Sequence, residues 1–298
     1  MRARRLRIRE LRSPAEFAEA SQAAKAAWGF PDLMVPPPPD MITATHAGGM
    51  TAGAFEGEVL LGFVHAVPRT NLGQPAIHSH LLAVRPEAQR RGLSVLLKLY
   101  QREWCLARGI GLVTWTYDPF MLRNARLNLV RLGAAVPVFL PDFYGRVGGI
   151  YGDLPSDRFE AHWRLDSPGV ERAVRGETSE VPAADAASLP VAASGPVRRR
   201  QTDKTGKGSV PFSVRTENGT DPGPLGPLTE NGTDPFPAKR VLLPFPAGFP
   251  KVFRDDLAAG VAARRRFGRT AAAFFAAGFE AVSVVERPAG PAYVLERP

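Results

Sequence analysis

The stretch Leu81-Leu-Ala-Val-Arg-Pro-Glu-Ala-Gln-Arg-Arg-Gly-Leu-Ser94 places a β-rich run, a basic loop and the start of a helical pattern in immediate succession. This order is typical of an anion-binding site, because the first N–H groups of a helix point outward and carry partial positive charge. We expect the backbone of residues 89–94 to face a bound diphosphate, reinforced by Arg90 and Arg91. Gly92 has no Cβ, so a phosphate can approach the backbone closely there.

The sequence on either side predicts an α/β fold. Upstream, Ser13 is placed as the N-cap of a helix that extends to about Trp28. Three short runs that are rich in β-forming residues then predict an antiparallel meander: 48–56, 59–67 and 76–84. Downstream, apolar residues recur at helical spacing as far as Gly109. The pattern then predicts a strand, a helix and a strand in turn: 112–117, 124–132 and 136–144.

Two motifs give the chain a resemblance to a known superfamily. Leu82-Ala83-Val84 closes the strand, and Gln89-Arg90-Arg91-Gly92-Leu93-Ser94 opens the helix. Together they resemble the signature of the GNAT superfamily of acyl-CoA-dependent N-acyltransferases, with Ser94 in place of its final small residue. The resemblance continues through Trp115-Thr-Tyr-Asp-Pro119 and Asn124-Ala-Arg-Leu-Asn128. It implies a GNAT-type mixed, largely antiparallel central sheet flanked by helices, over residues 1–166.

The resemblance also implies a ligand and a reaction. Acyl-CoA, either acetyl-CoA or succinyl-CoA, is the expected co-substrate, and no metal is needed. The acyl group would pass directly to a primary amine of a small molecule, such as an amino acid, in a ternary complex. Backbone N–H groups around Leu82, Ala83 and Val84 are the expected oxyanion donors. Asn124 and Asn128 are either helix-capping residues or hydrogen-bond partners of the pantetheine arm.

Two histidines are candidates for acid–base chemistry. His78 and His80 alternate with Ser79, so both imidazoles face one side of the strand, and His80 lies nearer the reacting end. His80 is the candidate general base, with a structural or substrate-positioning role as its alternative, and His78 is placed with the substrate. Leu129 stands where many GNAT enzymes have a tyrosine that donates a proton. Tyr144 is the candidate substitute, and simple packing is its alternative.

A narrower resemblance bears on the acyl group. Four short motifs are similar to a little-characterised bacterial subgroup of predicted GNAT acyltransferases: His78-Ser-His80, Trp115-x-x-Asp118-Pro119, Phe143-Tyr-Gly145, and Ser156-Asp-Arg158 with Trp163. Some relatives in that subgroup are associated with N-succinylation of amino acids. Arg158 and Arg123 are therefore placed near the acyl or acceptor pocket, because arginine binds a carboxylate through two N–H groups. The alternative for Arg158 is a turn pair with Asp157.

The composition limits other classes of function. Thirty-eight Lys and Arg against 29 Asp and Glu give the 298 residues a net charge of +9, which suits a polyanionic partner. A single cysteine excludes an internal disulfide and a clustered-cysteine zinc site. The basic N-terminus has no apolar run behind it, and no stretch reaches the roughly 20 apolar residues of a membrane helix. We therefore expect a cytoplasmic protein with no membrane partner.

The charge and the missing tyrosine also favour an alternative function. This is a catalytically silent GNAT-like module that binds acyl-CoA or nucleic acid as a regulator. The basic run 198–200 could contact nucleic acid, but a solvated linker is the more ordinary explanation, so nucleic acid is not an expected partner.

Beyond the GNAT-like part, two further segments are predicted. Residues 167–238 are expected to form a Pro/Gly-rich linker or insertion that is mostly irregular or disordered, in which the heptapeptide 216–222 recurs at 229–235. Residues 239–298 form a C-terminal β-α-β-β extension. That unit would pack on the main domain or on another subunit, which leaves a homodimer open.

Overall fold

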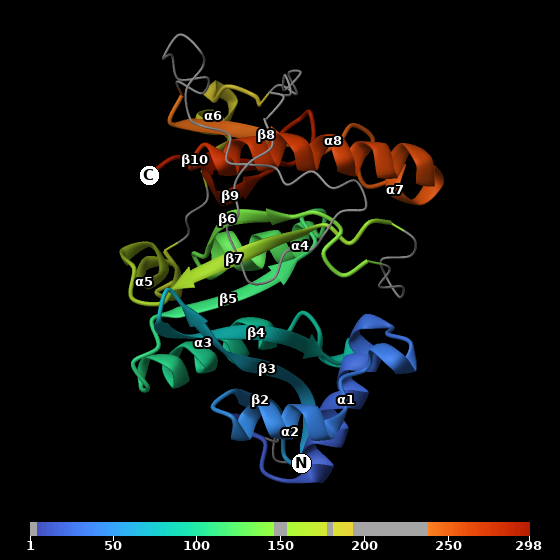
Figure 1. The fold of residues 1–298 in the computed structure, drawn as a ribbon, viewed down its shortest axis with the longest axis vertical. Helices are drawn as coiled ribbons and strands as arrows, with labels where there is room; N and C mark the ends of the chain where they lie inside the picture. Colours follow the sequence, from blue (N-terminus) through green and yellow to red (C-terminus); the bar gives the residue numbers. More distant parts are fainter. Residues whose placement is uncertain (1–4, 146–153, 178–180, 193–237) are drawn as a thin grey trace, which may run out of the picture.

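The computed structural model describes residues 5–145, 154–177, 181–192 and 238–298. These residues form a ten-stranded mixed sheet in the order β1-β2-β3-β4-β5-β7-β6-β9-β10-β8, with helices on its faces (Figure 1). Every pairing between neighbouring strands is antiparallel except the one between β4 and β5. The predicted mixed, largely antiparallel sheet flanked by helices, with a C-terminal extension, is therefore confirmed.

The first part of the chain builds the sheet edge that begins with β1. Its elements are β1 (Leu6–Glu10), α1 (Pro14–Trp28), η1 (Asp32–Met34), α2 (Pro38–His46), β2 (Met50–Glu56), β3 (Val59–Asn71) and β4 (Gln74–Val84). Ser13 caps α1 as predicted, because its hydroxyl accepts the N–H of Glu16 at 3.3 Å. Side chains on β3 alternate between two cores: Phe63 packs under α1 and α2, whereas Val64 packs on the α3 side.

The second part completes the region that holds the site. It comprises η2 (Pro86–Ala88), α3 (Leu93–Leu106), β5 (Leu112–Tyr117), α4 (Leu122–Ala125), η3 (Arg126–Arg131), β6 (Ala135–Leu140) and β7 (Arg158–Arg164). The helix predicted at 124–132 begins at Leu122, and its last turn, η3, is a π-helix. The strand predicted at 136–144 ends at Leu140, so Tyr144 lies in a turn rather than on a strand.

The third part is the C-terminal extension. It follows α5 (Pro168–Val174) and α6 (Ala183–Ser188), and it contains β8 (Arg240–Pro244), α7 (Val252–Asp255), α8 (Leu257–Ala276), β9 (Glu280–Val285) and β10 (Ala292–Glu296). The region predicted to be irregular thus contains two short helices, because apolar residues such as Val170 and Ala186 find buried positions. The repeat at 216–222 and 229–235 and the basic run 198–200 lie outside the described residues.

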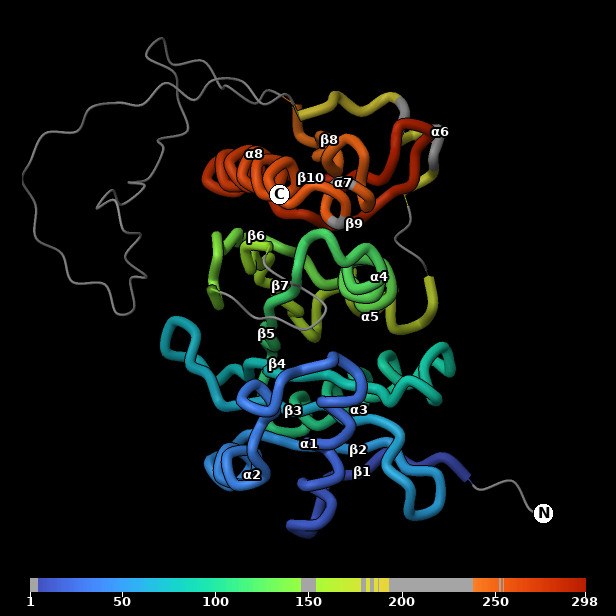
Figure 2. Tube along the Cα trace, turned by 90° about the vertical axis from the view of Figure 1, so that its right-hand side faces the viewer, coloured from blue at the N-terminus to red at the C-terminus, as the bar shows by residue number. Residues whose placement is uncertain are grey.

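The extension continues the sheet in an order that mirrors the GNAT-like half. Strands β5-β7-β6 on one side of the β6–β9 pair correspond to β8-β10-β9 on the other (Figure 2 shows β8, β9 and β10 stacked above β6). The pairing registers agree with this correspondence, because Phe159 faces Tyr117 and Phe139 just as Tyr293 faces Leu243 and Val284. The central pair is Val136 with Ala281. Each of these two residues lies three positions after a glycine with positive φ, Gly133 and Gly278.

Candidate active site

A divergence between β4 and β5 forms the framework of the site. The parallel ladder between these strands contains only the pairs Ile77–Val113 and His78–Thr114. Beyond those pairs, β4 continues to Val84 and β5 to Tyr117 without pairing to one another. The two strands therefore leave between them a gap in the backbone hydrogen bonding, which we call the splay.

A β-bulge lies where the splay begins. In the pairing of β3 with β4, His65 lies opposite Leu81 but Val67 lies opposite His78. Ser79 and His80 on β4 therefore together oppose the single residue Ala66 on β3. After the bulge, the N–H of Arg85 donates to the carbonyl of Leu61 at 2.8 Å.

The register after the bulge decides which backbone groups face the splay. Counting back from Arg85, every second residue, such as Ala83, directs its backbone N–H and C=O groups toward β3. The N–H and C=O groups of the intervening residues Leu82 and Val84 therefore point the other way, toward β5. Two side chains reach these outward carbonyls: Trp28 Nε1 lies 3.2 Å from the oxygen of Leu82, and Gln89 Nε2 lies 3.3 Å from that of Val84. Leu82 and Val84 can therefore donate their N–H groups into the splay, whereas Ala83 cannot.

The loop before α3 forms a nest of backbone N–H groups. Arg90 and Gly92 have left-handed φ values of 67° and 76°, while φ of Arg91 between them is negative. Gly92 is the N-cap of α3, and because glycine has no side chain it leaves the first N–H groups of the helix uncapped. Among the described residues, no hydrogen bond is donated by the N–H groups of residues 90–94. A phosphate or diphosphate fits this concavity, because it would accept those N–H groups.

The side chains around the nest only partly follow the prediction. Arg90 is exposed and Ser94 half-buried, whereas Leu93 is buried in the core and offers the nest its backbone alone. Arg91 instead pairs with Glu56 on β2 at 2.6 Å. Arg123, predicted near the acyl pocket, extends to Gln89 at 3.5 Å, which places it beside the nest.

Three histidines gather on the face of the sheet that carries α1 and α2. The His80 ring centroid lies 6.5 Å from that of His78 and 6.1 Å from that of His65 on β3. Burial lowers the pKa of His65 and of His78 to about 4, and it also lowers the pKa of the more exposed His80. All three imidazoles are therefore neutral near pH 7, which is the state in which an imidazole accepts a proton.

A polar network extends from His78 across the sheet. His78 Nδ1 lies 3.1 Å from Thr114 Oγ1, and Arg69 Nη1 donates to both Thr114 Oγ1 and Glu160 Oε1 at 2.7 Å. His162 Nε2 lies 3.1 Å from the same Glu160 oxygen. Burial alone would raise the pKa of Glu160, but hydrogen bonds from His162 and Arg69 hold it at about 2. Sequence reasoning missed Arg69, Glu160 and His162, although the spacing of Glu160 and His162 signals one face of a strand.

Tyr144 and Arg158 lie together at the far end of this face. The Tyr144 hydroxyl lies 3.0 Å from Thr116 Oγ1, and its ring lies 5.3 Å from the Arg158 guanidinium carbon. Arg158 is 4% exposed and also donates to the carbonyl of Asp157 at 2.9 Å. The structure thus brings the two residues together while keeping Arg158 in contact with Asp157, as the turn-pair alternative expected.

The α4 region departs from the prediction at one point. Met121 is the N-cap of α4, so Asn124 is not a capping residue. Asn128 is 4% exposed within the π-helical turn, and its carbonyl accepts the N–H of Ala134 at 2.9 Å. Leu129 in η3 is fully buried, so the position where many GNAT enzymes carry a tyrosine is apolar here.

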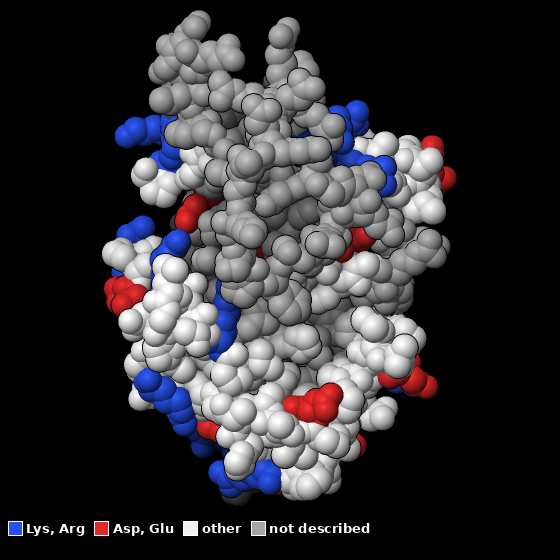
Figure 3. All heavy atoms as spheres, viewed as in Figure 1, with Lys and Arg blue, Asp and Glu red and all other residues white. Residues whose placement is uncertain are grey.

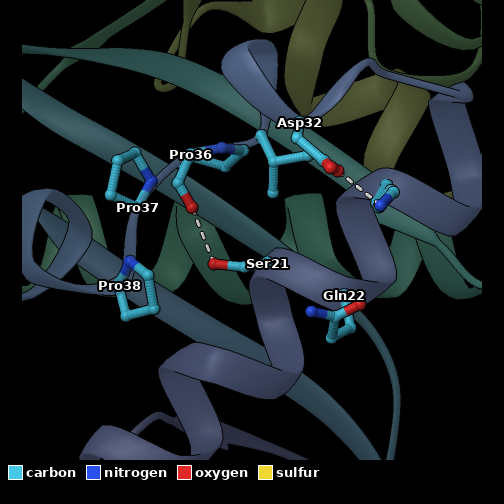
Figure 4. A pocket seen from close by; sticks show the side chains of 8 residues that line it. Ser21, Gln22, Asp32, Pro36, Pro37 and Pro38 are labelled. Carbon is cyan, nitrogen blue, oxygen red and sulfur yellow. Dashed lines mark hydrogen bonds and ion pairs between the residues drawn. The ribbon is translucent and has the colours of Figure 1, made fainter.

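Two further hollows lie away from the splay. One of about 360 Å³ lies between α1 and the segment 32–38, where Ser21 donates to the carbonyl of Pro36 at 2.6 Å (Figure 4). The other, of about 410 Å³, lies between Gly133 and the C-terminal extension. On the face drawn in Figure 3, the visible Lys and Arg side chains lie in several separate small groups rather than in one patch.

The described part of the chain lacks a metal-binding cluster and a membrane-spanning helix. No group of three or more His, Cys, Asp or Glu in this part of the chain could hold a metal ion. None of its helices is long and apolar enough to cross a membrane. Burial raises the pKa of Cys105 to about 12, which keeps this thiol protonated and unreactive.

Acidification is expected to destabilise the fold through His65. Its imidazole is 3% exposed and hydrogen-bonded to Thr51. Below pH 6.5, His65 therefore becomes protonated in the unfolded chain but stays neutral in the folded chain until the pH nears 4. Stability therefore falls as the pH falls from 6.5 toward 4, by about 2 kcal/mol at pH 5 for this residue. Urea unfolding at pH 7 and pH 5 measures the loss, which His65→Gln should reduce and the exposed-site control His46→Gln should retain. Equal acid sensitivity in both variants would contradict the assignment.

Several solved structures are similar to about half of the chain. A GNAT-family protein from Desulfovibrio desulfuricans is 17% identical, with 54% of this chain and 99% of that one covered and a TM-score of 0.46. The ribosomal-protein-S18-alanine N-acetyltransferase of Escherichia coli is 15% identical, with 55% and 96% covered and a TM-score of 0.45. A Salmonella typhimurium protein solved with acetyl-CoA is 17% identical, with 55% and 95% covered and a TM-score of 0.45.

Comparison of the sequence with known proteins and families gives two results. No curated protein sequence matches the chain. Residues 7–133, which include β1 through α3, the splay and the α4 region, match the model of the acetyltransferase (GNAT) family. Residues 7–133 are therefore similar to the acetyltransferase (GNAT) family, the same superfamily that the sequence motifs resemble.

Proposed function

We propose that the protein transfers an acyl group from acyl-CoA to a primary amine of a small molecule, by direct attack in a ternary complex. The observation that carries this proposal is the coincidence of three features on one path. The nest at residues 90–94 suits a diphosphate, the splay offers outward backbone groups of β4, and His80 lies at the bulge where the splay begins. The diphosphate, pantetheine arm and thioester of acyl-CoA would occupy these three places in turn.

The residues of the chain divide the chemistry between them. Neutral His80 accepts a proton from the incoming amine, whose nitrogen bonds to the thioester carbonyl carbon. The N–H of Leu82, which points into the splay, is placed to stabilise negative charge on the carbonyl oxygen. The C–S bond then breaks, its electron pair leaves with sulfur, and a proton completes the free thiol. Tyr144 is the sequence-based candidate for that last donor.

The face of the sheet that carries the three histidines, which we call the acceptor face, would suit a polar amine such as an amino acid. Arg69, Glu160 and His162 present a hydrogen-bonded charged network beside His78, and Arg158 adds a guanidinium at Tyr144. Arginine would recognise a carboxylate either on the acceptor or on a succinyl donor, so succinyl-CoA is proposed ahead of acetyl-CoA. A homodimer would need a surface other than the β6 edge, because β9 already pairs there.

Gly92→Ala should weaken CoA binding, whereas Gly109→Ala should not. Both glycines have positive φ, 76° and 70°, and neither has an atom within 4 Å of an added Cβ, so the backbone strain of the two variants is matched. Only Gly92 lies in the nest, where strain reshapes the N–H groups and a methyl group intrudes on the phosphate. Titration calorimetry with CoA should show a loss of about tenfold or more for Gly92→Ala, corresponding to ~1.4 kcal/mol. Equal affinities in the two variants would exclude this loop as the diphosphate site.

Activity itself is tested by release of free thiol. The protein is incubated with acetyl-CoA or succinyl-CoA and a panel of amino acids and small amines. Thiol release that depends on both the protein and the amine supports the enzyme. Tight CoA binding without any amine-dependent release would instead support the regulatory module.

A further inference from the structure

Lys98 on α3 is a buried amine that the chemistry above does not use. Its side chain is 2% exposed, and Nζ donates to Ser79 Oγ at 3.2 Å and to Gln101 Oε1 at 2.7 Å. The same nitrogen lies 3.7 Å from the ring centroid of Trp115 on β5 and 5.2 Å from that of Trp163 on β7. A cation in such a place loses its hydration, and aromatic faces replace only part of it.

The neighbours of Lys98 place it at the vertex of the splay. Ser79 directly follows His78, the last β4 residue paired with β5, and Trp115 directly follows Thr114, its partner. Nζ therefore lies where the two strands begin to separate, next to the bulge. A thioester that filled the splay to its end would meet this nitrogen from the α3 side.

Two further observations show that the surroundings of Lys98 are chemically unusual. Gln101 is fully buried, and its Nε2 finds no hydrogen-bond partner among the described residues. Burial also lowers the pKa of Lys98 to about 7, while the nearby thiol of Cys105 acts weakly in the opposite direction. His78 from β4 is the other titratable group that senses Lys98, and β5 and β7 present tryptophan rings rather than charges. An ammonium that titrates near pH 7 can release its proton readily.

We infer that Lys98 donates the proton that the departing CoA sulfur needs, in place of the tyrosine whose position Leu129 occupies. This inference rests on the proposed function. As the C–S bond breaks, the Nζ–H bond also breaks and its proton forms the S–H bond. The neutral amine regains a proton from water after CoA leaves, and the proton of the acceptor amine departs through His80. Tyr144 is less well placed, because Thr116 holds its hydroxyl on the acceptor face.

A titration of bound CoA tests the placement without turnover. A free thiol has a pKa of about 8.5, and an ammonium within about 4–6 Å should lower it by about 1–3. Thiolate absorbance of the CoA complex is followed against pH in the unmodified protein and in Lys98→Met, which has a similar length and should fold. Lys98→Met should raise the pKa of the bound thiol, whereas removal of an exposed charge in Lys25→Met should leave it unchanged. A bound thiol that titrates like free CoA in the unmodified protein would overturn the inference.

Kinetics then test the proton transfer. The kcat profile of the unmodified protein should fall on the alkaline side as Lys98 loses its proton. Lys98→Met should abolish that limb and lower kcat by about 10²-fold, the lower end for general acids because a thiolate is a good leaving group. Loss of the limb in Tyr144→Phe but not in Lys98→Met would overturn the inference in favour of Tyr144. An unmodified protein that binds CoA but never turns over would refute the proposed function, while the thiol titration would still decide the placement of Lys98.

Discussion

His80→Gln is expected to lower kcat/KM by about 10²–10⁴, the range for loss of a positioned general base. Glutamine keeps hydrogen-bonding atoms near the bulge but cannot take a proton from the amine. Because surrounding protein lowers the pKa of His80, the imidazole is free to accept that proton at neutral pH. Steady-state rates between pH 5 and 9 should show that the acidic limb of kcat/KM disappears together with the rate.

One control variant and one binding measurement make that result specific. His46→Gln changes an exposed histidine at the end of α2 and should leave the rate unaltered. CoA affinity of His80→Gln, measured by calorimetry, should stay within a few-fold, because the nest at residues 90–94 is untouched. A fully active His80→Gln protein would leave His80 with the structural role and move the search for the base to His78.

Arg264→Leu is expected to destabilise the protein by about 3–5 kcal/mol, the usual cost of leaving one partner of a buried ion pair alone. Arg264 on α8 donates to Asp118 at the end of β5 at 2.8 Å, and the two side chains are 4% and 3% exposed. Asp118 also accepts the N–H of Phe120, while Tyr293 donates to the carbonyl of Pro119. The C-terminal extension thus holds the turn that follows β5.

Urea unfolding measures this loss, with a surface pair as the control. Arg240 and Glu296 join two strands of the same extension, but their side chains are 47% and 40% exposed. Arg240→Leu should therefore change stability by less than about 1 kcal/mol. The double variant Asp118→Asn with Arg264→Met should recover part of the loss, because no unpaired charge stays buried. A loss below 1 kcal/mol for Arg264→Leu would show that water reaches the pair.

Local patterns predicted much of the fold and the ligand loop. The capping of α1 by Ser13 and the bounds of β5 are decided by neighbours in the sequence, and both were predicted correctly. The nest was also foreseeable, because a strand, a basic glycine loop and an apolar helical stripe follow one another within 14 residues. The binding of CoA by this loop remains a prediction.

Contacts between distant residues were beyond such reasoning. Arg69 and Glu160 are 91 positions apart, and Asp118 and Arg264 are 146 apart, so only the sheet order brings them together. Lys98 falls on the buried face of α3, where a helical pattern would expect an apolar residue and where a lone lysine is ordinarily solvated. What keeps it buried is the pair of tryptophans, which come from two strands further along the chain.

The ends of the long sheet have a consequence for how the protein behaves in crowded solution. An open outer strand is a template on which another chain can add a strand and begin to aggregate. At one end, β1 is five residues long and carries the exposed Arg7, whose charge opposes such strand addition. At the other end, residues 190–192 cover the outer side of β8, where Leu242 donates to Pro190 at 2.8 Å and accepts from Ala192 at 2.7 Å. Both edges of the ten-stranded sheet are thus protected against the addition of a strand from another chain.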